Sequence, residues 1–447
     1  MTSEKMNAAL AIPLPRPQSV RLLLVCVHRY AGLAMTAFLV IASLTGSILA
    51  FAQELERLFS PPLHVSAMGR KPLDPGILAE QALRLVPGAT LNAITLRFRP
   101  EESYKVTFDS PTQKQQSRVL SVTLDPYTGA ELARETGIQG PRGYPFWPIT
   151  RHNVMNFIRV LHYSLAIPGS AGVLLFGIVA VIWTVDCFVG LFLTLPPRRR
   201  GSIDERDQTR WTLPRRFLQR WAIAWKVRLR GSAFRVNFDL HRAFGLWLWL
   251  MLLVFAWSSV CLTLNDEVYQ PVMQTLFGLV TPYLDPQPLP QPRLVPAIGW
   301  IQAHRISRRL MSEQAAHGHF SIDWEDVLNY DSSSGAYTFI VHTSRDIASE
   351  WGSTAIAFDG ESGKFLGFNA PSGQNGAATF TTWITTLHFA AIGGLPMKIF
   401  VSTMGFVIAM LAITGVVIWR RKRKSGRFSR LRGAAFRRET KAPQSAG

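Results

Sequence analysis

Four histidines occur at repeated positions in this 447-residue chain, and they are the side chains best placed to do chemistry. His28 lies in the motif 27–33, and His241 lies 213 residues later in a closely similar motif. A second pair of related motifs contains His162 and His388. Neutral imidazole is a common metal ligand, so the repeated spacing makes these four histidines candidate ligands.

A single histidine near the end of an apolar segment also has a plain structural explanation. Ionisable residues are common near membrane interfaces, where lipid headgroups or backbone carbonyls satisfy them. Four histidines at repeated positions are harder to explain in this way than one. The pattern therefore favours a shared role as ligands.

Four apolar segments accompany these histidines and are long enough to cross a membrane: Ala31–Phe51, Leu165–Leu195, Ala243–Leu264 and Pro396–Trp419. A bilayer core needs about 20 mostly apolar residues per helix. The chain is 48% hydrophobic and only 17% charged, yet its formal net charge is +19, so apolar and basic segments must alternate. The first segment is too long for a signal sequence and lacks a small-residue cleavage site. The sequence therefore predicts a membrane α-helical protein with a four-helix transmembrane bundle.

Two strongly basic segments set the predicted orientation. Residues 198–235 carry twelve Lys or Arg against three acids, and residues 420–441 carry eleven against one. By the positive-inside rule both segments face the cytoplasm, so both chain termini are expected there. The basic runs flank spans and lack the interleaved aromatic residues of a nucleic-acid-binding fold. We therefore expect contact with anionic membrane lipids and no nucleic acid as a partner.

The predicted organisation consists of two copies of one unit, each made of a span, an outer domain and a second span. In chain order it comprises a cytoplasmic tail (1–20), transmembrane helix 1 (21–52), an extracytoplasmic domain (53–150), transmembrane helix 2 (151–196), a basic cytoplasmic loop (197–236), transmembrane helix 3 (237–264), a second extracytoplasmic domain (265–380), transmembrane helix 4 (381–420) and a basic cytoplasmic tail (421–447).

Each outer domain has the pattern of a small α+β unit, with one helix on an antiparallel sheet. In the first domain we expect a helix near 76–85 and strands near 90–98, 104–108 and 119–124. In the second we expect a helix near 297–316 and strands near 336–342 and 354–358.

The direction of each span decides which histidines can meet. His28 and His241 each begin an outward-going span near the cytoplasmic face, whereas His162 and His388 each begin an inward-going span near the outer face. A continuous helix from His162 to Pro196 would be about 50 Å long and would exceed a bilayer core of about 30 Å. Histidines of one repeat would then be too far apart to share an iron.

Histidines from different repeats can pair instead, His28 with His241 and His162 with His388. Each pair could ligate a haem iron through two axial imidazoles, and such six-coordinate iron favours electron transfer over oxygen binding. The chain has three cysteines, all at or within predicted spans, and no CxxCH motif. We therefore expect two non-covalent b-type haems.

Three charged residues are candidate partners of these sites. Arg29 and Arg242 each follow a histidine on the cytoplasmic side and could hold a haem propionate by two hydrogen bonds; they could equally be anchors that extend to lipid headgroups. Asp186 lies deep in the second span and could bond the free ring nitrogen of a cytoplasmic-side ligand. It could equally be a solvated residue at the helix end.

Other residues give weaker signals. His152 lies ten residues before His162 and is a substitute ligand at best. The sequence His317-Gly318-His319 offers two possible metal ligands but has no further ligand residues nearby, so we expect these two histidines to be ordinary surface residues. No catalytic triad order, phosphate-binding loop or dinucleotide fingerprint occurs, so electrons must come from a separate donor.

The histidine motifs, the Leu44-Thr45-Gly46 sequence of the first span and the Asp-x-x-x-Gly turns at 125–129 and 359–363 together resemble the PepSY-associated transmembrane family over about residues 20–424. The third span departs from the pattern, since Trp257-Ser258-Ser259 replaces Leu-Thr-Gly there. The departure weakens the packing correspondence of the repeats and leaves the histidine spacing untouched.

This resemblance implies that the outer domains are PepSY-like and that the protein is similar to dihaem ferric-siderophore reductases of the bacterial inner membrane. Such a protein would pass electrons across the membrane to a periplasmic ferric-siderophore and release iron as Fe(II). The donor would be a cytoplasmic flavin reductant or quinol. The aromatic segment Tyr144–Trp147 could form a wall for the chelate, or an interfacial aromatic belt.

Two other classes of function remain open from the sequence. The outer modules resemble ones linked with peptidase inhibition, so the chain could be a membrane-anchored binding or peptidase-modulating protein without redox activity. It could also be a transporter of the iron chelate, with intramembrane polar residues along the path.

Overall fold

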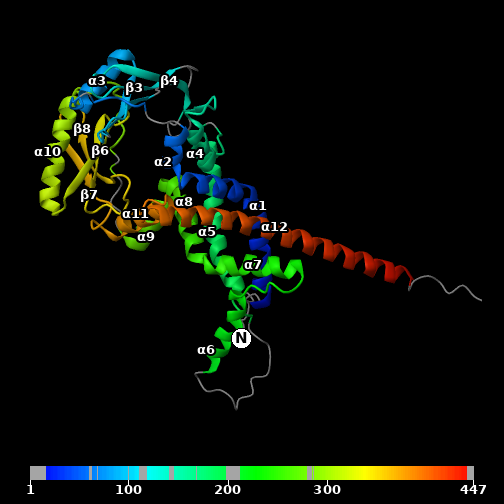
Figure 1. Cartoon of the computed structure of the whole chain (residues 1–447). Coiled ribbons are helices and arrows are strands. Elements are labelled where there is room, and N and C mark those ends of the chain that lie inside the picture. Colours follow the sequence, from blue (N-terminus) through cyan, green and yellow to red (C-terminus); the bar gives the residue numbers. More distant parts are fainter. Residues whose placement is uncertain are drawn as a thin grey trace, which may run out of the picture. The chain divides into compact units, whose positions relative to one another are not determined.

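The computed structural model describes residues 17–59, 63–67, 69–98, 100–109, 118–139, 145–167, 169–197, 212–278, 284 and 286–439 (Figure 1). The chain divides into two compact units. The first unit consists of Met1–Val40, Val179–Ala256 and Val407–Gly447, and the second unit consists of Ile41–Ile178 and Trp257–Phe406. Helices α1 (Pro17–Leu49), α5 (Ala171–Thr194), α8 (Trp249–Thr263) and α12 (Gly394–Glu439) contribute residues to both.

Three described helices are long and apolar enough to cross a membrane: Val20–Leu49 in α1, Ala171–Thr194 in α5 and Gly394–Lys424 in α12. A fourth span is obtained if α7 (Ala233–Trp247) and α8, which are bent by 69° at their junction, count as one. Most of each predicted apolar segment is thus helical, and the chain is a membrane protein. The third span is broken, however, where we expected one helix over 237–264.

The second span also differs from the prediction. Residues 151–196 were expected to form one helix, but α4 (Val154–Ser164) ends before α5 begins at Ala171. Leu165, Ala166 and Gly169 adopt positive φ angles in the connection, and the sequence places a proline at position 168, which cannot continue a helix. The expectation of one long helix after His162 was therefore wrong, because His162 lies near the end of a short helix that precedes the span.

The fourth span has the same arrangement. We expected a helix over 381–420, but α11 (Gly376–His388) ends at the histidine and α12 begins at Gly394. Ala390, Gly393 and Gly394 have positive φ angles, which interrupt right-handed helix. Helix α12 then continues to Glu439, beyond the predicted span (Figure 1). The two repeats therefore share a short helix that carries the histidine and a turn before the span.

In the first unit, a short helical segment packs against the ends of the spanning helices. It consists of α6 (Thr212–Trp221) and the 3₁₀-helix η3 (Ala222–Trp225). The Trp221 indole donates a hydrogen bond to the Thr194 hydroxyl on α5 at 3.2 Å, and the Trp247 indole donates to the Trp225 carbonyl at 3.1 Å. Helix α7 begins at Ala233, and the side chain of the preceding Ser232 accepts from the Arg235 amide as an N-cap.

The second unit contains one nine-stranded antiparallel sheet with the order β5-β4-β3-β2-β1-β6-β7-β8-β9. The strands are β1 (Thr90–Thr95), β2 (Tyr104–Asp109), β3 (Arg118–Leu124), β4 (Glu131–Gln139), β5 (Pro145–Trp147), β6 (Ile322–Asp331), β7 (Ala336–Thr343), β8 (Thr354–Asp359) and β9 (Phe365–Asn369). The second unit also contains the short helices α2 (Ala52–Phe59), α9 (Gln270–Phe277) and the π-helix η4 (Asn265–Tyr269).

We had expected each outer segment to form a sheet of its own, but the two segments share one sheet. Strand β1 of the first segment pairs with β6 of the second, with Ile94 opposite Leu328. Sequence patterns missed β6, which pairs on one side with the next strand, β7, and on the other side with β1, more than two hundred residues away. Joining the two edges satisfies backbone groups that each separate sheet would leave open.

Helices α3 (Pro75–Leu85) and α10 (Trp300–Gly318) pack against this sheet and against each other. A Cβ atom at Gly76 would lie 2.8 Å from the Ile301 backbone, so glycine permits the close approach of the two helices. Leu78, Phe108 and Tyr337 are among the fully buried side chains of the shared core. Burial of each such side chain contributes about 1.5–3 kcal/mol, so the core holds both segments together.

Two ion-pair networks connect elements of the second unit. His304 on α10 lies 2.8 Å from the Glu325 carboxylate on β6, and Arg308 donates two further hydrogen bonds to that carboxylate. Lys398 on α12 is 6% exposed and pairs with Glu54 on α2 at 2.9 Å and with Glu350 in the β7–β8 connection at 2.7 Å.

Candidate functional site

The first pair consists of His28 on α1 and His241 on α7, both in the first unit. Their ring centroids are 6.1 Å apart and their planes meet at 63°. The structure thus brings together two histidines that are more than two hundred residues apart, as the repeat predicts.

Each ring of the first pair is oriented through Nδ1. His28 Nδ1 lies 2.9 and 3.0 Å from the two carboxylate oxygens of Asp186 on α5. His241 Nδ1 lies 3.0 Å from both the Leu411 carbonyl and the Thr414 hydroxyl on α12. An ionised carboxylate and a carbonyl only accept hydrogen bonds, so Nδ1 carries the proton in both rings.

The second pair consists of His162 on α4 and His388 on α11, both in the second unit. Their centroids are 6.2 Å apart and their planes meet at 76°. His162 Nδ1 lies 2.9 Å from the Ala42 carbonyl and 3.1 Å from the Thr45 hydroxyl. His388 Nδ1 lies 2.7 Å from the Ser258 hydroxyl. This pair has the same architecture as the first.

Both separations fit two imidazoles on opposite sides of one iron. A metal–imidazole bond is about 2 Å long, and the ring centre lies about 1.2 Å behind the ligating nitrogen, so two rings that ligate one metal from opposite sides would have centres about 6.4 Å apart. A histidine that donates from Nδ1 ligates through Nε2, and such an outer hydrogen bond fixes the ring orientation. The residues present therefore suit a bis-histidine haem at each pair.

Glycines pack against three of the four rings. A Cβ atom would lie 3.5 Å from Cε1 of His28 at Gly190, and 3.5 Å from Cε1 of His241 at Gly415. At Gly46 it would lie 3.0 Å from Cε1 of His162, closer than ordinary contact. Small residues at these positions allow the helices to approach the imidazoles closely.

The two predicted arginines differ in their surroundings. Arg242 donates to Asp239 at 2.9 Å and to the Ile223 carbonyl at 2.9 Å, but its Nε is buried without a hydrogen-bond partner in the described part of the chain. Asp239 is fully buried and also binds Arg228. An orphaned buried N–H costs free energy, so Arg242 is suited to receive a further carboxylate such as a haem propionate. Arg29 is half-buried, and over the described ranges its guanidinium makes no hydrogen bond or ion pair.

The remaining predicted residues lie away from the two pairs. His152 is exposed and belongs to neither pair. Trp147 is 53% exposed, while Tyr144 lies outside the described residues. His317 bonds the Glu313 carbonyl, and no cluster of three metal-binding side chains occurs in the residues that the structure describes.

Several partners of the histidines were missed from the sequence. Thr45 and Ser258 occupy equivalent repeat positions, since each follows its repeat's first histidine by 17 residues. Where Trp257-Ser258-Ser259 replaces Leu-Thr-Gly, a serine hydroxyl stands in place of the threonine hydroxyl. The hydrogen bond to the histidine ring is therefore kept in both repeats, although the surrounding packing residues differ. A search for hydroxyls at the repeat spacing could have found these two residues.

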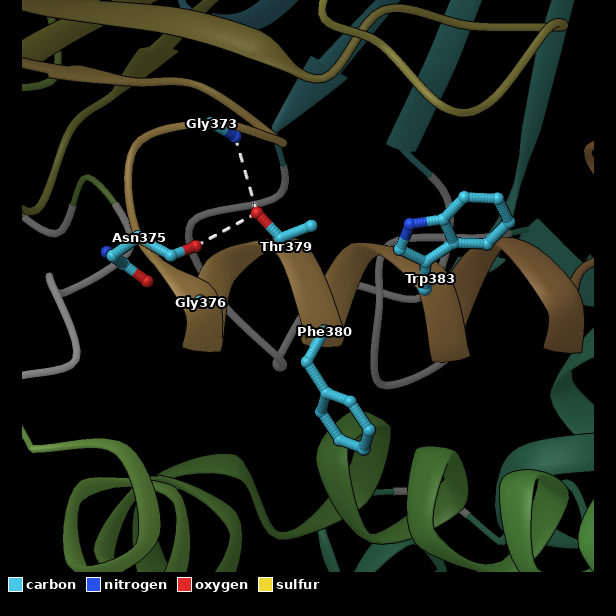
Figure 2. Close-up of a pocket in the computed structure, with 6 residues that line it drawn as sticks. All are labelled: Gly373, Asn375, Gly376, Thr379, Phe380 and Trp383. Atoms are coloured by element: carbon cyan, nitrogen blue, oxygen red, sulfur yellow. Dashed lines mark hydrogen bonds between the residues drawn. The ribbon is translucent and has the colours of Figure 1, made fainter.

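An open depression lies along α11, on the helix that ends in His388 (Figure 2). Phe380 and Trp383 line it and are both exposed, and Phe380 points to the opposite side of the helix from Thr379 and Trp383 (Figure 2). The Thr379 hydroxyl accepts from the Gly373 amide at 3.3 Å and donates to the Asn375 carbonyl at 2.9 Å, which fixes the start of the helix.

Comparison with known proteins yields one family. The family model described as the PepSY-associated TM region matches residues 25–422, a range that includes all four histidines. No curated protein matches the chain.

Proposed function

Because the chain belongs to the PepSY-associated transmembrane family, we propose that it is a haem-dependent reductase of the bacterial inner membrane. It passes electrons across the membrane to a ferric-siderophore in the periplasm and releases iron as Fe(II). The observation that carries this proposal is the presence of two histidine pairs, at 6.1 and 6.2 Å, each drawn from both repeats. The basic segments support an orientation with both termini in the cytoplasm.

In this proposal the chain's residues bind and orient two haems. His28 and His241 would hold one through their Nε2 atoms, and His162 and His388 would hold the other. Hydrogen bonds at Nδ1 keep each ring in the tautomer that ligates through Nε2. Haem bound by two imidazoles would supply one-electron transfer. Arg242 is placed to hold a propionate.

The reaction adds one electron to the ferric ion of the chelate, which gives Fe(II) and the intact siderophore. Siderophores bind ferric iron far more tightly than ferrous iron, so reduction loosens the metal without breaking a covalent bond. A cytoplasmic reduced flavin or a membrane quinol each supplies two electrons and so serves two ferric ions. The protein contributes positioning and control of the redox potential.

Haem content tests the proposal directly. Full-length protein, purified after haem-replete expression, is expected to show a Soret band, sharp α and β bands on reduction, and two haems per chain. His388→Ala should remove one haem and leave the other reducible, and His241→Ala should do the converse. His317→Ala is the matched control and should keep both.

Two outcomes favour the alternative functions. Colourless protein would overturn the proposal in favour of a membrane-anchored binding or peptidase-modulating protein. In vesicles with an internal reductant, external ferric chelate should be reduced without entering the lumen. Accumulation of intact chelate inside would instead indicate a transporter.

A further inference from the structure

The four ligand histidines differ in what their Nδ1 atoms bond. His28 bonds both oxygens of the Asp186 carboxylate, at 2.9 and 3.0 Å. In the described part of the chain, the Nδ1 atoms of His241, His162 and His388 lie within hydrogen-bond distance of carbonyl and hydroxyl oxygens, which carry no net charge. The first pair therefore has a formal negative charge in direct contact with one of its ligands.

This difference arises at one position of the repeat. On α5, Gly190 packs on the His28 ring, and Asp186 lies four residues before it. On α12, Gly415 packs on the His241 ring, and Leu411 lies four residues before it. Asp186 and Leu411 thus occupy equivalent places beside equivalent histidines. The second repeat offers a backbone carbonyl where the first offers a carboxylate.

A buried carboxylate at this place has a predictable effect on bound iron. Asp186 is 9% exposed, in a helix whose other residues are almost all apolar. A carboxylate that accepts from Nδ1–H raises the basicity of the imidazole, and a buried negative charge acts through a low dielectric. Both effects favour the ferric over the ferrous state. They therefore lower the reduction potential of the first pair's site.

We propose that Asp186 is a positioning residue that holds the reduction potential of the His28–His241 site below that of the His162–His388 site. Electron transfer from the first site to the second is then favourable at equilibrium, which gives the conduit its direction. This inference rests on the proposed haem function. It adds that the direction of electron transfer is set by the Asp186 carboxylate and not by the ferric chelate alone.

A structural role for Asp186 has to be distinguished from this one. An acidic residue inside an apolar helix needs a partner whatever its function, and His28 supplies it. The isosteric change Asp186→Asn removes the charge and keeps an oxygen that accepts from Nδ1–H. Asp186→Ser copies the neutral hydroxyl that Ser258 gives to His388. Asp186→Glu keeps the charge.

The test is an optical redox titration of the purified full-length protein at fixed pH, repeated in a His388→Ala background that retains only the first site. In that background Asp186→Asn and Asp186→Ser should raise the remaining midpoint potential, and Asp186→Glu should change it little. With both sites present, the equilibrium constant for electron transfer from first to second should fall at least tenfold, which corresponds to about 59 mV. Thr414→Val, which removes a neutral partner of His241, is the matched control and should shift the potential less.

Three results would overturn the inference. One is an unchanged or lowered potential in both neutral variants. Another is a shift in Thr414→Val as large as that in Asp186→Asn. The third is loss of the first haem from both neutral variants but not from Asp186→Glu, which would make the carboxylate a requirement for binding. A wild-type protein without haem would instead refute the proposed function itself.

Discussion

Gly46 offers a sharp test of how closely the protein packs around a ligand histidine. A methyl group at this position would lie 3.0 Å from Cε1 and 3.6 Å from Nδ1 of His162, whereas carbon atoms in favourable contact are about 3.5–4.0 Å apart. In Gly46→Ala the ring must therefore withdraw by about 0.5 Å. Its Nδ1 contacts with Ala42 and Thr45, at 2.9 and 3.1 Å, would be strained as a result.

The size of the effect follows from comparison with Gly32 on the same helix. A Cβ atom at Gly32 has no atom within 4 Å, so Gly32→Ala gains only helix propensity, about 1 kcal/mol. Gly46→Ala gains the same propensity but overpacks the site, at a cost of about 1–3 kcal/mol. The difference between the two variants isolates the contact with His162, because the propensity gain cancels.

The assay is thermal unfolding and haem occupancy of the two full-length variants. Gly46→Ala should be less stable than Gly32→Ala and should lose occupancy or shift the potential at the His162–His388 site alone. In Gly190→Ala and Gly415→Ala the new methyl groups would lie 3.5 Å from the His28 and His241 rings. These two variants should leave the His162–His388 site unchanged. Equal stability and equal spectra in Gly46→Ala and Gly32→Ala would refute the packing argument.

Three further predictions concern the ion pairs. Burial raises the pKa of Glu325, but hydrogen bonds from His304 and Arg308 outweigh it and lower the pKa to about 2 from a usual 4.5. The carboxylate therefore stabilises the fold above pH 4.5 and loses this contribution as the pH falls towards 2. Glu325→Gln should lower the free energy of unfolding by about 3 kcal/mol at pH 7 and by almost nothing near pH 2. Thermal unfolding at both pH values measures the difference. Lys398→Met removes two charge-assisted hydrogen bonds, to Glu54 and Glu350, and should destabilise the second unit by about 1.5–3 kcal/mol. A melting temperature like that of wild type would contradict a stabilising role for this cluster. Arg242→Gln should lower haem occupancy or potential at the first pair without loss of membrane insertion, and an unchanged redox titration would count against propionate binding.

Local patterns predicted much of the fold. The helix expected near 76–85 is α3 over 75–85, and the strand expected near 119–124 is β3 over 118–124. Amphipathic period and turn residues suffice for such elements, because they depend on neighbours in sequence. The pairing of β1 with β6 depends on residues more than two hundred positions apart. No local pattern encodes that pairing.

The helix breaks before the second and fourth spans show a different limit. The sequence signals them through the proline and glycine at 168 and 169 and the glycines at 393 and 394. Leu165 and Ala390 also take up positive φ angles there, although such residues rarely do. Long apolar stretches on either side made a continuous helix the simpler prediction. Tertiary packing overrode it.

The histidine pairs were predictable, whereas most of the groups that bond them were not. Side chains that repeat with the same spacing can be recognised, so the sequence pointed to four histidines and to Asp186 as a candidate. A backbone carbonyl such as that of Ala42 or Leu411 has no signature, because every residue has one. Sequence alone can therefore locate ligands more readily than it can locate what orients them.

Duplication explains why each pair takes one histidine from each half of the chain. Equivalent histidines lie at equivalent depths in the two repeats, and they meet when the repeats pack together. The sheet follows the same rule, since β1 and β6 join the halves edge to edge. Exact two-fold symmetry would make the two histidines of one pair equivalent, but it would not relate one pair to the other, because the pairs use different positions of the repeat. The divergence of Asp186 from Leu411 makes the two histidines of the first pair unequal, since His28 contacts a carboxylate and His241 contacts a backbone carbonyl.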